Sequence, residues 1–255
     1  MSRRLHVLAV LVVSQSVGLA LALGVALSFG DRLPAWAWIV AAAGGAAGAL
    51  GLGAFYRSMA IGTVSVVTPV ASLGVIVPVA VGLARGESPA AIQLGGLALA
   101  MVGILFASRE AELRGWATSP ESLLLAALGG LGFGTFFVAL DAAAAEDTAW
   151  ALFAGRGGGV AVVTGAWLAF GRPSPAGEGA LRALLAMGLL DILANGLYAV
   201  ATTKGLLSLV AVGGSLYPVV TVLLARFVLD ERLARLQLAG VALALLGVVL
   251  IAAGV

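Results

Sequence analysis

The chain has 255 residues, of which 62% are hydrophobic and 10% charged, and its mean hydropathy is +1.13. These values lie far outside the range of soluble domains and predict an integral membrane protein. The net charge of +2 is too small, and the basic residues too dispersed, for a nucleic-acid partner. The absence of cysteine excludes disulfides and thiolate metal sites.

Apolar runs long enough to cross a bilayer as helices follow one another along the chain. Nine spans are predicted, near 5–29, 35–56, 63–84, 90–108, 121–141, 149–171, 182–203, 206–226 and 235–255. The breaks between them carry charged residues, glycine and proline, as in GDRLP at 30–34. The predicted fold is therefore an all-α membrane protein with about nine transmembrane helices.

The positions of arginine and lysine predict the orientation of these spans. One set of alternate loops holds ten basic residues, and the other holds three, Arg32, Arg85 and Lys204. Because basic loops stay in the cytoplasm, the N-terminus is expected inside and the C-terminus outside. The expected location is the inner, cytoplasmic membrane.

Two segments of the chain repeat one another. Residues 86–106 (GESPAAIQLGGLALAMVGILF) align without a gap with 230–250 (DERLARLQLAGVALALLGVVL), with nine identities in 21 positions. Shared polar residues and glycines hold the same places: Glu87, Gln93, Gly96 and Gly103 match Glu231, Gln237, Gly240 and Gly247. The matched spans are five helices apart, and an odd shift reverses orientation in the membrane. The repeat is thus predicted to be inverted, as in secondary transporters.

The segments 56–106 and 198–252 resemble the C-terminal part of an EamA-like repeat of the drug/metabolite transporter superfamily. In the second half the resemblance rests on a mid-helix proline, a short turn with glutamate and a Q-x-x-G helix opening, at Pro218, Glu231, Gln237 and Gly240. It implies two repeats of five helices, whereas the first half shows four spans. The first repeat is therefore expected at 1–110, without the usual first helix, and the second at 120–255. A truncated reading frame and a natural nine-helix variant both explain the missing helix.

A polar stripe is predicted on the seventh span. Asp191, Asn195, Tyr198 and Thr202 fall at i, i+4, i+7 and i+11, which places them on one helix face. An aspartate at mid-span costs roughly 2.5–3.5 kcal/mol on insertion scales, so this face should meet protein or a hydrated cavity. The stripe is either a structural seam between helices or a binding site for substrate or protons.

Arg156 is the other clear charge within a span, and it resembles an arginine often found in the second helix of an EamA-like repeat. It could bind an anionic group of a substrate, snorkel to the outer surface or pair with Asp191. Pairing and a role in binding are compatible. Tyr217 and Gln15 complete the predicted substrate-binding residues, which are Asp191, Asn195, Tyr198, Arg156, Tyr217 and Gln15.

Three prolines, Pro69, Pro78 and Pro218, are predicted to break helices, because each removes a backbone hydrogen bond within a span. Such breaks serve either as packing kinks or as parts of binding sites. Glu87 and Glu231 lie at helix junctions, where capping of the following helix explains them.

The leading hypothesis is a secondary transporter that moves a small metabolite or amphipathic compound by alternating access. No catalytic residue, metal or cofactor is expected. The alternatives are an intramembrane enzyme, for which the sequence shows no cluster of histidine, cysteine or paired carboxylates, and a non-transporting receptor or accessory protein. The expected partners are a small-molecule substrate and the lipid bilayer, without nucleic acid, and a homodimer is left open.

Overall fold

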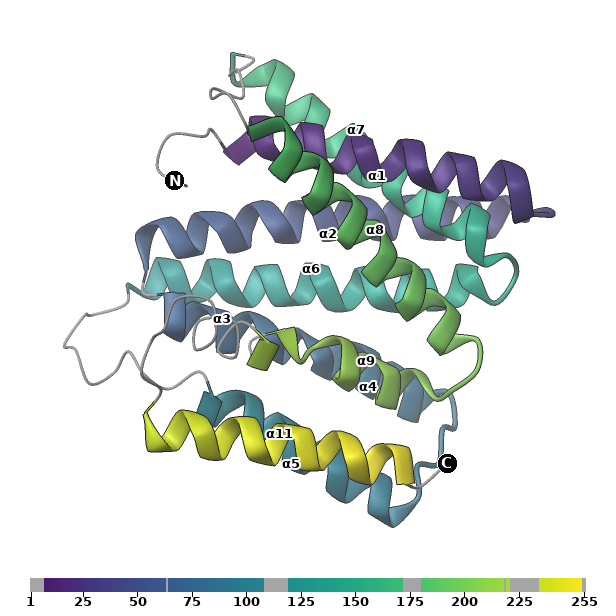
Figure 1. Ribbon diagram of the computed structural model, residues 1–255. Coiled ribbons are helices and arrows are strands. Elements are labelled where there is room, and N and C mark those ends of the chain that lie inside the picture. Colours follow the sequence, from purple (N-terminus) through teal and green to yellow (C-terminus); the bar gives the residue numbers. More distant parts are fainter. Residues whose placement is uncertain are drawn as a thin grey trace. The chain divides into compact units, whose positions relative to one another are not determined.

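The computed structural model describes residues 7–62, 64–107, 119–171, 180–217, 219–220 and 234–253, and the regular elements in these ranges are helical (Figure 1). The α-helices are α1 (Val7–Phe29), α2 (Ala35–Ile61), α3 (Val64–Ser72), α4 (Ile76–Ala84), α5 (Ala91–Ala107), α6 (Pro120–Ala144), α7 (Thr148–Ala169), α8 (Ala180–Thr202), α9 (Leu207–Gly214) and α11 (Arg235–Ala253). A short 3₁₀ helix, η2 (Leu73–Val75), separates α3 from α4. The predicted all-α fold is confirmed.

Five helices are long and apolar enough to cross a bilayer, namely α1, α2, α6, α7 and α8. The chain also has three shorter apolar helical segments, Val70–Ala84, Ala91–Phe106 and Arg235–Ile251. Large apolar side chains are exposed on these helices, among them Ile39, Leu190 and Leu197. Exposure of such an apolar surface to water would be unfavourable in free energy, whereas contact with lipid tails is not. The chain is a multi-pass membrane protein.

Three of the predicted spans are wrong in detail, among them 206–226, because α9 ends at Gly214 and residues 215–216 form a turn. α2 continues past residue 56 to Ile61, because Gly62 is the first helix breaker after the predicted end. The span 63–84 is not one helix, since η2 interrupts it. Pro78 has no N–H to donate to the carbonyl of Gly74, so the regular α-helical ladder is interrupted there.

The structure divides into two compact units that do not follow the boundary of the predicted repeats. Unit 1 comprises Met1–Leu52 and Thr135–Lys204, and unit 2 comprises Gly53–Gly134 and Gly205–Val255. Each unit thus takes segments from both predicted repeats, and the helices α2 and α6 each contribute to both units. The repeat boundaries at 1–110 and 120–255 remain a prediction.

In unit 2, α5 and α11 pack side by side through matched glycines (Figure 1). A methyl group on Gly96 would lie 2.6 Å from the carbonyl oxygen of Gly247, and one on Gly103 would lie 2.7 Å from that of Gly240. The start of α5 therefore meets the end of α11, and the two helices run antiparallel. Since Gly96 is equivalent to Gly240 and Gly103 to Gly247, the two contacts are the same contact made twice. This local two-fold relation agrees with an inverted repeat.

The starts of these two helices are also equivalent. Gln93 Oε1 accepts a hydrogen bond from the backbone N–H of Ala90 at 2.8 Å, and Gln237 Oε1 accepts one from that of Ala234 at 2.9 Å. In each case a glutamine in the first turn reaches back to the residue before the helix, as in one half of a capping box. The two glutamines that match in sequence therefore cap the starts of their helices in the same way.

Glu87 caps a helix of the other predicted repeat. Its carboxylate accepts hydrogen bonds from the backbone N–H groups of Leu207 at 2.6 Å and Ser208 at 3.0 Å, at the start of α9. The expected capping of the following helix, α5, is therefore replaced by capping of α9. The negative charge suits a helix N-terminus, where unpaired N–H groups carry partial positive charge. The equivalent Glu231 lies outside the described residues.

In unit 1, α7 is fixed at its start and along one face. Asp147 Oδ1 accepts from the N–H of Trp150 and Oδ2 from the N–H of Asp31, both at 2.8 Å, which caps α7 and ties it to the loop before α2. Farther along, the carbonyl of Gly155 lies so close to Gly45 of α2 that α2 could not carry a side chain at that position. The glycine face of α7 is thus occupied by α2.

Candidate functional site

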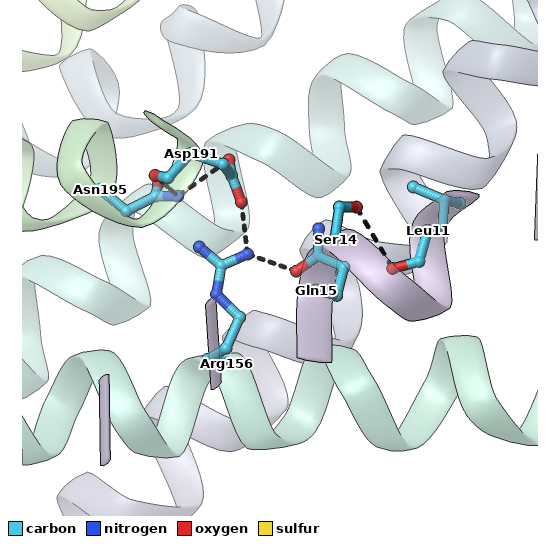
Figure 2. A network of polar contacts seen from close by, with 6 residues as sticks. All are labelled: Leu11, Ser14, Gln15, Arg156, Asp191 and Asn195. Carbon is cyan, nitrogen blue, oxygen red and sulfur yellow. Dashed lines mark hydrogen bonds and ion pairs between the residues drawn. The ribbon is translucent and has the colours of Figure 1, made fainter. Parts of the chain in front are cut away.

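A partly buried ion pair joins α7 to α8 in unit 1 (Figure 2). Arg156 Nη1 on α7 donates to Asp191 Oδ2 on α8 at 2.5 Å. The same Nη1 also donates to Gln15 Oε1 on α1. Asn195, one turn beyond Asp191 on α8, extends the group. We refer to Gln15, Arg156, Asp191 and Asn195 as the polar cluster.

Glycines let the three helices come close enough to form the polar cluster. Gly18 on α1 lies against the arginine, because a methyl group there would be 3.2 Å from Arg156 Nε. Gly188, one turn before Asp191 on α8, lies against α1, since a methyl group there would be 2.5 Å from the carbonyl oxygen of Ser14. The glycines thus place α1 against both neighbours, beside the charged residues.

The two charges of the cluster differ in exposure. The side chain of Arg156 is 7% exposed, whereas that of Asp191 is 42% exposed. A buried guanidinium without a partner would be very unfavourable, so Asp191 and Gln15 are needed to stabilise it. The carboxylate is the charged group that another molecule can reach.

The predicted stripe on α8 divides into two parts. Asn195 Nδ2 donates both to Asp191 Oδ1 at 3.2 Å and to the Asp191 carbonyl at 2.9 Å, so these two residues act together. Tyr198 is buried and stacks on Phe137 of α6, with ring centroids 4.3 Å apart. The Thr202 hydroxyl donates to the carbonyl of Ala199 at 3.0 Å. The structure thus brings Asp191 and Asn195 to Arg156, while Tyr198 packs on Phe137 and Thr202 bonds to its own helix.

Tyr217 belongs to unit 2, where its hydroxyl donates to the carbonyl of Thr68 at 3.5 Å. Pro69 lies in α3 and the buried Pro78 in the first turn of α4, on either side of η2. Pro218 lies outside the described residues. Pro69, Pro78 and Tyr217 all belong to unit 2, whereas the polar cluster belongs to unit 1.

Two features of the site were missed by the sequence analysis. Gly18 and Gly188 are needed for the close approach of α1, but single glycines in a chain with 36 of them carry little signal. The signal that could have found Gly18 is its spacing from Gln15, since residues three apart share a helix face. Gly188 and Asp191 have the same spacing on α8.

Comparisons with known proteins identify the fold and the family of the chain. Twenty-two chains of known structure match. One of them, described as "Crystal structure of protein", superposes with a TM-score of 0.76 at 19% sequence identity, and the match covers 98% of this chain and 89% of the other. This likeness shows the fold. No curated protein matches the chain. The model of the EamA-like transporter family matches residues 121–253, which is more than half of the sequence. The chain therefore belongs to the EamA-like transporter family, whose members are membrane proteins of the transporter type.

Proposed function

We propose that this chain is a secondary transporter that moves a small metabolite or amphipathic compound across the cytoplasmic membrane by alternating access. Membership of a transporter family supports the general class. The two-fold contact of α5 with α11 supports an inverted repeat, whose equivalent halves can open alternately to the two sides. The polar cluster of unit 1 is the proposed place of substrate contact.

The observation that carries this proposal is the ion pair between Arg156 and Asp191 at 2.5 Å within apolar helices. Ionisable residues at such positions are expensive, and in transporters they commonly mark the path of a substrate or proton. A purely structural pair would gain little over apolar packing, because the desolvation of two charges offsets much of their attraction. The exposure of Asp191 adds a reason to assign it a role in binding.

Transport is tested with purified protein in liposomes, by counterflow uptake of a panel of labelled metabolites. A functional Asp191 predicts that Asp191→Asn abolishes uptake or its pH dependence while most of the protein still folds. The double variant Asp191→Asn with Arg156→Gln separates the two roles, because it removes both charges together. If the pair is only structural, the double variant should regain both stability and uptake. If it is functional, stability should recover without uptake.

A matched control is Glu146→Gln, which removes a carboxylate from an exposed loop of the same unit. It should leave uptake unchanged. Normal uptake with an unaltered pH profile in a stable Asp191→Asn protein would remove the polar cluster from the mechanism. Absence of counterflow with every compound in the panel, by folded wild-type protein, would count against the transport function itself.

A further inference from the structure

The hydrogen bonds within the polar cluster leave a particular set of groups for a ligand. The amide nitrogen Nδ2 of Asn195 donates to both the carbonyl and Oδ1 of Asp191. The α8 side of the cluster therefore presents oxygen acceptors, namely the carboxylate of Asp191 and Oδ1 of Asn195. A carboxylate has about four lone-pair positions, and the bonds from Arg156 and Asn195 fill two of those on Asp191.

The positive charge of the cluster is far less accessible than the negative charge. The Arg156 side chain is 7% exposed, against 42% for Asp191, and Gly18 of α1 lies against its guanidinium. Arg156 donates to Asp191 and Gln15 through Nη1, and its other N–H groups belong to a side chain that is only 7% exposed, so an anion reaches them less easily than a cation reaches the Asp191 carboxylate. The amide Nε2 of Gln15 is a further donor, but it is neutral and does not require an anionic partner. The cluster is thus better suited to a cationic group than to an anionic one.

We infer that the polar cluster recognises an organic cation bearing at least one N–H, such as a primary, secondary or tertiary ammonium group, through Asp191 and Asn195 Oδ1. This inference rests on the proposed transport function and names the substrate class of the same site. An ammonium N–H donates a charge-assisted hydrogen bond to the carboxylate, which is about twice as strong as a neutral one. A quaternary ammonium carries the charge without the donor and loses that bond.

The test compares compounds with one apolar scaffold and four different head groups. The probes are 2-phenylethylamine, its N,N,N-trimethyl derivative, 2-phenylethanol and 3-phenylpropanoate, together with the corresponding butyl and cyclohexylethyl sets. Binding to purified full-length protein in detergent is measured by calorimetry. At least one amine should bind about tenfold or more tightly than its quaternary, alcohol and carboxylate counterparts.

The variants connect the preference to the cluster. Asp191→Asn combined with Arg156→Gln should fold and lose the preference for the amine, whereas Glu146→Gln should keep it. Tighter binding of a carboxylate, an alcohol or a quaternary compound, or no binding by any amine, would overturn the inference. A preference that survives in the folded double variant would also overturn it.

Counterflow then separates this inference from the proposed function. If an amine binds with the expected preference and is taken up by liposomes with wild-type protein, both stand. Binding without uptake supports the ligand class and contradicts transport of that class by this protein. If other compounds are taken up but no amine binds, the proposed transport function is supported and the inferred ligand class is refuted.

Discussion

Replacing Gly103 by alanine should force α5 and α11 apart. A methyl group at this position would lie 2.7 Å from the carbonyl oxygen of Gly240, whereas ordinary contact begins at 3.4 Å. Ala244 of α11 is also too close, through its backbone nitrogen. Because both obstacles are backbone atoms, no side-chain rotation can relieve the overlap. The helices must therefore separate locally by more than about 0.7 Å, the difference between these two distances, because the nitrogen of Ala244 is closer still.

The expected cost follows from that separation. A gap of about 0.5–1 Å forfeits a quarter to a half of the dispersion energy of the atoms that lose contact. Overpacking of this kind costs about 1–3 kcal/mol, and the better helix propensity of alanine returns about 0.5–1 kcal/mol. A net loss of about 1–2 kcal/mol should lower Tm by roughly 2–8 °C, using the scaling for soluble proteins of this size.

The assay is thermal unfolding of the purified variants in one detergent. Gly95→Ala is the matched control, because a methyl group at Gly95 on the same helix meets nothing within 4 Å. It should melt at or slightly above the wild-type temperature. The two-fold relation further requires Gly247→Ala to cost about as much as Gly103→Ala. Equal melting temperatures for Gly103→Ala and Gly95→Ala would refute the close glycine contact.

Three further predictions concern other parts of the chain. Glu87→Gln should lower stability by about 1 kcal/mol, because it removes the negative charge at the N-terminus of α9; in a melting assay, no greater loss than for Glu146→Gln would contradict this. Gly45→Ala should be destabilising, because its methyl group would overlap the backbone of α7, and should melt well below Gly157→Ala, which meets nothing within 4 Å. A fluorescent reporter that matures only in the cytoplasm should stay dark when fused to the C-terminus, because the distribution of arginine and lysine predicts an external C-terminus. Fluorescent cells would show that the C-terminus lies in the cytoplasm and contradict this prediction.

The features of the fold that the sequence could predict are those that depend on local or repeated signals. Long apolar runs locate α1, α6, α7 and α8 to within a few residues. The matched glycines made Gly96 and Gly103 equivalent to Gly240 and Gly247, although the sequence did not predict that α5 would pack against α11. Arg156 and Asp191 could be considered as partners because few other charges lie within the spans.

What could not be predicted depends on partners distant in the chain. Glu87 caps α9 through Leu207, which lies 120 residues later in the chain. Rules for capping residues consider only the helix that directly follows the capping residue. Gln15 could be placed within its span but not against Arg156, since no local pattern identifies the neighbour of a helix face. The prolines predicted an irregular backbone in 63–84, but the position of η2 depends on which hydrogen bonds are retained.

The pairing of α5 with α11 also sets an order for biogenesis. Helix α5 leaves the ribosome long before its partner, since every residue between Ala107 and Arg235 must first be synthesised. At about 5–20 residues per second this interval is on the order of ten seconds. During it, the face of α5 that carries Gly96 and Gly103 lacks its partner, while all the segments of unit 1 have been made once Lys204 is added. Nascent chains that stall before α11 should therefore be recognised by membrane proteases through unit 2.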